Sequence, residues 1–296
     1  GIDTNAGDRH ANTRTPNTVL GAKLVDLQKF MASHIKVATW ARVMDGGKDG
    51  GPVWEYLIRS ANAAGDAEVA AREKATKDLA DILEPVLKMG KMGGKGQWFP
   101  TVNRSLNREA RIAIALNVGN ESNLQRLLGG EGWTMQQLQP VLDTLSQEEW
   151  NAVQAVWDYF ESFRPAIGAK EKRVYGREPV WIEATPVTTK YGELRGGYYP
   201  VKYDTRASER AESHAEAEDA KQMMRGAYTS ATTRRSFTKT RAEEVNGRPL
   251  LLSLDGVYNG VQEVIHDLSW HEFLIDASRL VRNKAVSGAM RNRYGP

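Results

Sequence analysis

The sequence predicts a mainly α protein, a multi-helix, bundle-like domain with one β-hairpin at about residues 180–203. Two observations predict this fold class. Apolar residues recur at intervals of three and four along most of the chain, which is the spacing of helices with one buried face. The spacing breaks at residues 179–204, "PVWIEATPVTTKYGELRGGYYPVKYD", where valine, isoleucine, threonine and tyrosine gather in two short runs typical of strands.

The composition is that of a globular protein. The chain has 296 residues, of which 41% are hydrophobic and 26% are charged. No apolar run approaches the roughly 20 residues that a membrane-spanning helix needs, so we predict no membrane span. The absence of cysteine excludes disulfides, thiolate zinc sites and cysteine nucleophiles. A net charge of +3 is too small to indicate nucleic-acid binding by itself.

We expect three parts along the chain. Residues 1–17 are polar and predict a flexible N-terminal segment. Residues 18–95 predict an N-terminal helical subdomain, and residues 96–296 a helical domain into which the hairpin is inserted. The abrupt end at "MRNRYGP" suggests a fragment of a longer protein.

The N-terminal subdomain begins with an apolar helical stripe at 18–44, which a glycine-rich connector, "DGGKDGGP", interrupts. A second helix is expected beyond Pro52. A third is expected from Asp66, as N-cap, to Met89, with Pro85 bending or dividing it. Another glycine-rich connector follows this helix.

Helix start signals recur in the second domain. A helix is expected from about Ser105, and another after Thr134 as N-cap. Ser146 and Glu149 form the Ser-x-x-Glu pattern of a capping box. The helix that follows carries an apolar and aromatic stripe that indicates core packing: Trp150, Val153, Val156, Trp157, Phe160 and Phe163. One or two apolar helices are expected near the C-terminal end.

The predicted hairpin has a structural interpretation. Pro186 and Pro200 lack a backbone donor and suit edge positions. The paired glycines in "GGYYPVKYD" would let the backbone approach a helix closely. Strand alternation would place Tyr199 and Tyr203 on one side and Tyr198 on the other. A substrate pocket is the competing interpretation.

The motifs that suggest chemistry are incomplete. "MGKMGGKGQ" lacks the glycine and the hydroxyl of a phosphate-binding loop. His266 and His271 are five residues apart, whereas a zinc-binding helix uses a spacing of four. No nucleophile motif is present. We therefore identify no catalytic residues and predict no metal and no cofactor.

Residues 225–241, "RGAYTSATTRRSFTKTR", contain several cations and no acid. Cations and hydroxyls can contact phosphates, and an aromatic ring can stack on an unpaired base. Alternatively, these cations pair with acids of the preceding helix. The candidate nucleic-acid-binding residues are Arg225, Arg234, Arg235, Lys239 and Arg241.

Whole segments, among them "MDGGKDGGPVWEYLIR", "SLNREARIAIALNVGNESNLQRLL" and "VWDYFESFRP", resemble a module of the very large multidomain (polyvalent) proteins that tailed bacteriophages and prophages encode. The resemblance runs from about residue 30 to the C-terminus. It implies a virion-associated protein, or an internal virion protein ejected with the DNA, located in the virion or in the cytoplasm of the bacterial host. It implies no catalytic residues.

Two functional hypotheses follow. The first is a non-enzymatic structural or interaction module whose partners are other parts of the parent polypeptide, other virion proteins or DNA. The alternative is a nucleic-acid-binding or nucleic-acid-processing enzyme domain that uses residues 225–241. The sequence indicates neither a ligand nor an oligomeric state.

Overall fold

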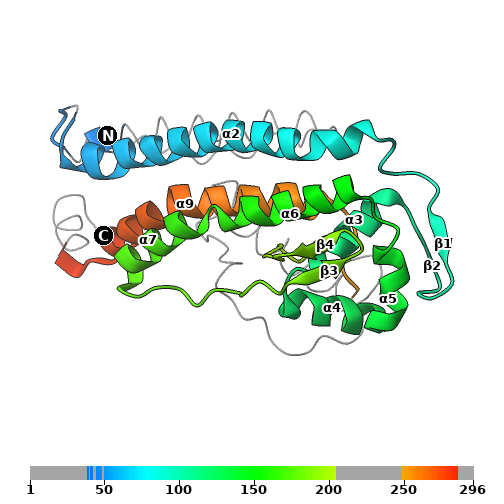
Figure 1. Ribbon diagram of the computed structural model, residues 1–296. Helices are drawn as coiled ribbons and strands as arrows, with labels where there is room; N and C mark the ends of the chain where they lie inside the picture. Colours follow the sequence, from blue (N-terminus) through cyan, green and yellow to red (C-terminus); the bar gives the residue numbers. More distant parts are fainter. Residues whose placement is uncertain (1–38, 40, 43–44, 49, 205–248, 286–296) are drawn as a thin grey trace, which may run out of the picture. The chain divides into compact units, whose positions relative to one another are not determined.

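The computed structural model describes residues 39, 41–42, 45–48, 50–204 and 249–285 (Figure 1). Helices dominate these residues, and the strands form two short antiparallel hairpins. The predicted mainly α fold class with a β-hairpin is therefore confirmed. Internal contacts divide the chain into two units, and within the described residues the first ends at Asn62 and the second begins at Ala63. The predicted parts 1–17, 18–95 and 96–296 remain a prediction.

The first unit contains the start of a helical segment after a glycine-rich turn. The carboxylate of Asp45 accepts hydrogen bonds from the backbone amides of Val53 and Trp54, both at 2.9 Å. These amides belong to the first turn, where no intrahelical acceptor exists, so Asp45 caps the segment. Helix begins at Pro52, where the sequence predicted a start just beyond this residue, and includes the π-helix η2, Trp54–Arg59.

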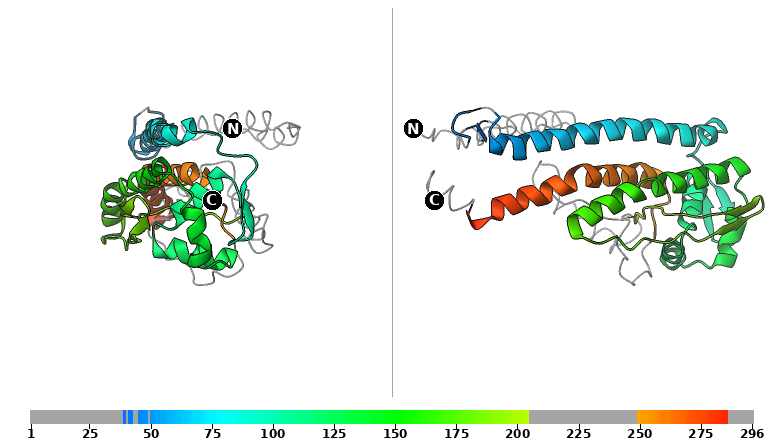
Figure 2. Two further views of the ribbon diagram at one scale, coloured as in Figure 1. Left: turned by 45° about the vertical axis from the view of Figure 1, so that its right-hand side comes forward. Right: turned by 60° about the vertical axis from the view of Figure 1, so that its left-hand side comes forward.

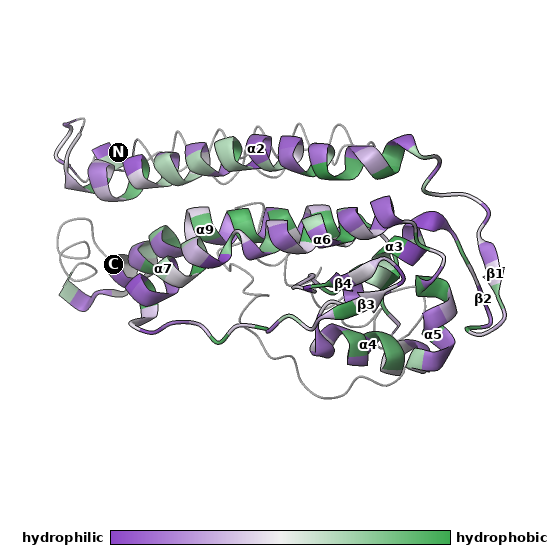
Figure 3. Ribbon diagram, viewed as in Figure 1, coloured by the Kyte–Doolittle hydropathy of each residue, from purple (hydrophilic) through white to green (hydrophobic). Residues whose placement is uncertain are grey.

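Helix α2, Ser60–Lys88, is unbroken. The predicted separate start at Asp66 is wrong, because the chain is already helical before Gly65 and Asp66 lies exposed within the helix. Pro85 lies in the last turn of α2 and does not divide the helix. Hydrophilic and hydrophobic residues alternate along α2 (Figure 3). Its buried residues are Ala64, Ala75, Leu79, Leu83 and Val86.

The β1–β2 hairpin was not predicted. It pairs β1, Gln97–Phe99, with β2, Arg104–Leu106. The sequence suggested a connector and then a helix from Ser105, but α3, Arg108–Asn117, begins after Asn107, whose side chain accepts from the Ala110 amide at 2.8 Å. Each strand has only three residues, too few for the alternation that identifies a strand in sequence.

Helices α4, α5 and α6 begin as their local sequences require. They span Glu121–Glu131, Met135–Leu142 and Gln147–Glu161. Thr134 and Ser146 each form a complete capping box, so both predicted N-caps are confirmed. The predicted stripe of α6 is buried at Trp150, Val153, Val156, Trp157 and Phe160.

The predicted hairpin exists but is shorter than expected. It consists of β3, Val187–Thr189, and β4, Gly192–Leu194. The "GGYY" segment has no strand structure, and only Tyr203 forms an isolated bridge, with Leu250. The predicted alternation of tyrosines is therefore wrong: Tyr198 and Tyr199 are 3% and 2% exposed. Tertiary contacts surround both rings and replace strand alternation.

Helix α7, Arg164–Tyr175, contacts α9, Asp255–Arg282 (Figure 1). Figure 2 shows α9 as a single long helix, where the sequence left open one or two. Val257, Val261, Val264 and Ile265 of α9 join the main apolar core. That core also includes residues of α2, the β1–β2 hairpin and α3 to α7, so it holds the second unit together.

Candidate functional site

Among the described residues, several buried charged groups lie between α7 and α9. We call Lys170, Tyr175, Asp267 and His271 the α7–α9 cluster. Lys170 is 1% exposed and its Nζ contacts Oδ2 of Asp267, which is 5% exposed. Glu171 Oε1 lies 3.5 Å from the same Nζ. A buried ion pair is tolerated only when its two charges lie close together, because their attraction offsets the cost of removing them from water. Lys170 and Asp267 meet this condition.

The cluster continues from the Lys170–Asp267 pair toward the surface. The second oxygen of Asp267, Oδ1, lies 3.3 Å from Nδ1 of His271, one helical turn later. Nε2 of His271 lies 2.8 Å from the hydroxyl of Tyr175, a side chain that is 39% exposed. The four residues thus form a line in which a lysine contacts a carboxylate, the carboxylate lies close to an imidazole, and the imidazole contacts a phenol.

An ion pair lies beside this cluster. Arg173 donates from Nε and Nη2 to the two carboxylate oxygens of Glu272, at 2.8 and 2.7 Å. The hydrogen bonds from Arg173 hold the pKa of Glu272 below its usual value. The pair is well exposed, so it adds little to the free energy of unfolding.

A second polar contact joins α2 to α9. Glu68 accepts a hydrogen bond from Nε1 of Trp270 at 2.6 Å, and its Oε1 lies 3.1 Å from Nδ1 of His266. Arg72 also donates to it from Nε at 3.0 Å. Burial acts to raise the pKa of Glu68, but the hydrogen bonds from Trp270, His266 and Arg72 outweigh burial and lower it. Glu68 therefore stays a charged acceptor.

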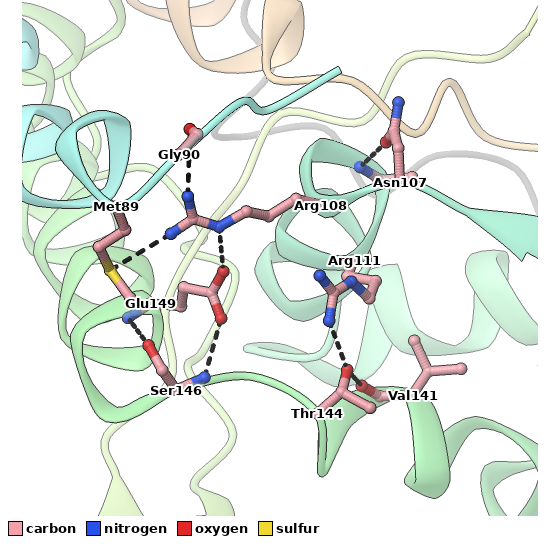
Figure 4. A network of polar contacts seen from close by, with 10 residues as sticks. Met89, Gly90, Asn107, Arg108, Arg111, Val141, Thr144, Ser146 and Glu149 are labelled. Carbon is pink, nitrogen blue, oxygen red and sulfur yellow. Dashed lines mark hydrogen bonds and ion pairs between the residues drawn. The ribbon is translucent and has the colours of Figure 1, made fainter. Parts of the chain in front are cut away.

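A third network surrounds Arg108, at the start of α3 (Figure 4). Its Nε donates to Glu149 Oε1 at 2.6 Å, and the other oxygen of Glu149 accepts from the Ser146 amide at 2.8 Å. Arg108 also donates to the carbonyl of Gly90 at 3.3 Å and to the sulfur of Met89. One arginine thus ties the segment after α2 to the N-terminus of α6.

The "GGYY" segment is held by asparagines. Asn120 donates to the carbonyl of Gly197 at 3.1 Å and Asn123 to that of Tyr199 at 2.7 Å. The Tyr199 hydroxyl donates to the Ser253 carbonyl at 3.2 Å. Burial, with smaller contributions from nearby carboxylates, raises the pKa of Tyr199 well above its usual value. These contacts agree with the structural interpretation of the segment.

A surface groove of about 370 Å³ lies between α7 and the segment that follows it. Arg164, Gly168, Lys172, Glu178 and Trp181 are among the residues that line it. The charges that line the groove are partly compensated, because Lys172 lies 4.0 Å from Glu178. The Arg164 guanidinium lies 5.1 Å from the centre of the Trp181 ring. No residue of the α7–α9 cluster lines this groove.

Arg225, Arg234, Arg235, Lys239 and Arg241 lie outside the described residues, so their role stays a prediction. His266 and His271 both belong to α9 but contact different partners, Glu68 and Asp267.

Sequence reasoning missed the α7–α9 cluster. Its one local signal is the four-residue spacing of Asp267 and His271, which places both on one side of a helix. Nothing in the sequence connects them to Lys170, 97 residues away from Asp267. Among the described residues, no group of three or more histidines and carboxylates is placed to hold a metal ion.

Comparisons of the chain with protein-family models, with curated proteins and with solved structures find no match. In the part of the chain that the structure describes, none of the helices combines the length and the apolar character that crossing a membrane requires.

Proposed function

We propose that this chain is a non-enzymatic structural or interaction module of a large phage or prophage protein, carried in the virion or injected with the DNA. Its partners would be other parts of the parent polypeptide or other virion proteins. The phage origin rests on the resemblance of whole sequence segments. The structural role rests on how the buried polar groups are used.

The observation that supports this role most strongly is the contact of Lys170 with Asp267. Both side chains have the chemistry of a catalytic group, yet both are buried and bonded to one another across 97 residues of sequence. The same holds for Asn123, which bonds the Tyr199 carbonyl 76 residues away. Polar groups used in this way fix one arrangement of helices, which a scaffold requires.

The alternative, a nucleic-acid-binding or nucleic-acid-processing enzyme domain acting through residues 225–241, remains a prediction. The five cations on which it depends lie outside the residues that the structure describes.

Mass spectrometry of purified virions tests the proposed location. We expect peptides of this chain in particles of the phage that encodes it, in an amount proportional to that of the known virion proteins. Their absence from particles, with the chain present in infected cells, would contradict a virion role and favour an intracellular one.

Replacement of the buried lysine tests the structural role. Lys170→Met leaves the Asp267 carboxylate buried without its cation, so we expect the free energy of unfolding to fall by about 3–5 kcal/mol. The double variant Lys170→Met/Asp267→Leu removes the charges of this pair and should recover part of that loss, because the buried Glu171 still loses the lysine beside it. Urea unfolding followed by circular dichroism measures both.

Arg173→Met is the matched control, because its pair with Glu272 is exposed and should contribute little to the free energy of unfolding. An unfolding curve for Lys170→Met that coincides with that of the unmodified protein would show that the buried pair does not hold α7 against α9.

A further inference from the structure

We propose that the outer face of the β1–β2 hairpin binds single-stranded nucleic acid, with a base stacked on Trp98 and phosphates contacted by Lys91 and Lys95. This inference goes beyond the function proposed above and concerns a part of the chain to which the sequence assigned no role. It rests on the exposure of one ring, the rigidity of its support and the distribution of charge.

Trp98 presents its ring to solvent. It is 56% exposed, whereas Phe99 beside it is 4% exposed. In the register of the hairpin, Trp98 pairs with Ser105, and the flanking pairs are Gln97 with Leu106 and Phe99 with Arg104. Because paired residues share a face, Trp98 and Ser105 form the outer face while Phe99 and Leu106 face the core. No ring contact of Trp98 exists among the described residues.

The hairpin that carries Trp98 is fixed at several points. Phe99 and Leu106 belong to the main apolar core. The turn is closed by a hydrogen bond from the Asn103 amide to the Pro100 carbonyl at 3.3 Å. Arg104 donates to Glu131 of α4 at 2.6 Å. A ring held on such a support loses little conformational freedom when a base stacks on it, which favours binding.

The segment of chain that contains the hairpin is rich in cations. Residues 85–108 contain no acid and five cations, Lys88, Lys91, Lys95, Arg104 and Arg108. Three of these pair with carboxylates outside the stretch, at Glu84, Glu131 and Glu149. Lys91 and Lys95 are exposed and make no ion pair with any residue that the structure describes. They remain available to a polyanion.

An exposed aromatic ring and exposed lysines a few residues earlier in the chain form a combination that can bind unpaired bases and their phosphates. The other exposed side chains of the hairpin include Gln97, Thr101, Asn103 and Ser105, which can bond phosphate, sugar or base edges. These polar neighbours favour a nucleic acid over a lipid surface as the partner, because insertion into lipid needs a larger apolar face. A duplex hides its base faces and cannot stack on Trp98.

Fluorescence anisotropy of the full chain with a labelled oligothymidylate of about 16 nucleotides tests the proposal. We expect binding at low salt. Trp98→Ala should weaken it by about 5- to 150-fold, the loss of one stacked base, and Trp98→Phe should retain most of the affinity. Lys91→Ala/Lys95→Ala should reduce the slope of log affinity against log salt by about 1.4, because two phosphate contacts are lost.

Matched controls remove an aromatic ring or two charges elsewhere. Tyr191→Ala removes another exposed ring, and Lys74→Ala/Lys77→Ala makes the same change in charge on α2. Both should bind as the unmodified protein does.

Several results would overturn the proposal. One is no binding of the single strand at low salt by the folded protein. A second is equal binding by Trp98→Ala, which would assign the affinity to another segment such as 225–241. A third is equal affinity for duplex without dependence on Trp98. A fourth is binding to anionic phospholipid vesicles but not to the oligonucleotide. None of these depends on whether the chain is found in virions.

Discussion

Two segments of this protein contain paired glycines, and these glycines lie in opposite environments. In "GGKGQW", residues 93–98, a methyl group added at Gly93 would meet no atom within 4 Å, and Trp98 is 56% exposed. At 196–199, "GGYY", a methyl group added at Gly197 would lie 2.5 Å from Cβ of Trp157, which is fully buried. Paired glycines thus serve an open connector at Gly93 and Gly94 and a tightly packed junction at Gly196 and Gly197.

The difference between the segments lies in what faces them. Trp157 donates from Nε1 to the Leu116 carbonyl at 3.0 Å, and the Gly197 amide donates to the Gly119 carbonyl at 2.8 Å. Gly196 has φ of +75°, and a side chain there would also lie 2.6 Å from the Gly119 carbonyl oxygen. Glycine is required here because three backbone segments and an indole ring meet.

The largest difference in the free energy of unfolding should come from replacing the buried tryptophan, Trp157, and the exposed one, Trp98, each by alanine. Trp157→Ala empties a buried site and should lower the free energy of unfolding by about 3–5 kcal/mol. Trp98→Ala removes an exposed ring and should change it by less than about 0.5 kcal/mol. Urea unfolding of both variants measures the contrast. Equal losses of stability would mean that the surroundings of Trp157 and Trp98 do not differ in packing.

An intermediate effect should come from adding one methyl group to each segment. Gly197→Ala forces the backbone away from Trp157 and should cost about 1–3 kcal/mol, as overpacked sites do. Gly93→Ala places its methyl group in open space and should be neutral or slightly stabilising. Thermal unfolding of the pair compares them directly. A stable Gly197→Ala variant would show that the junction can expand, contrary to the contacts described.

The smallest effect should come from the Tyr199 hydroxyl. Tyr199→Phe removes its hydrogen bond to Ser253 and should cost about 0.5–1.5 kcal/mol near neutral pH. Because the pKa of Tyr199 is raised in the folded protein, its contribution is complete below the unfolded value of about 10 and is lost as pH rises toward the folded pKa.

The stability of the unmodified protein should therefore decline above about pH 10 more steeply than that of Tyr199→Phe. Tyr191→Phe, at an exposed site, is the control and should leave the slope unchanged. Parallel curves for all three proteins would show that Tyr199 ionises as readily in the folded protein as in the unfolded chain.

Features that depend on a few neighbouring residues were predicted correctly. Thr134 and Ser146 begin helices because their side chains bond amides only three residues away. Such a contact needs no partner from a distant part of the chain. The stripe of α6 is equally local. Asp66 shows the limit, since a good N-cap residue is not used when the helix already begins before it.

Features that depend on distant partners were missed or wrong. The β1–β2 hairpin has three residues per strand, and its strands are recognisable only because Phe99 and Leu106 reach the core. The tyrosines of "GGYY" do not alternate because asparagines of α4 and its N-cap hold the backbone in place of a neighbouring strand.

The sequence by itself determined the helical class, the helix starts at Thr134 and Ser146 and the place where the helical pattern breaks, because these follow from side-chain spacing and local hydrogen bonds. Only the tertiary structure decided that Lys170 meets Asp267, that Gly197 meets Trp157 and that Trp98 faces solvent. The physical reason is that burial and ion pairing depend on which surfaces face one another after folding, and residues some 40 to 100 positions apart carry no local signal of that meeting.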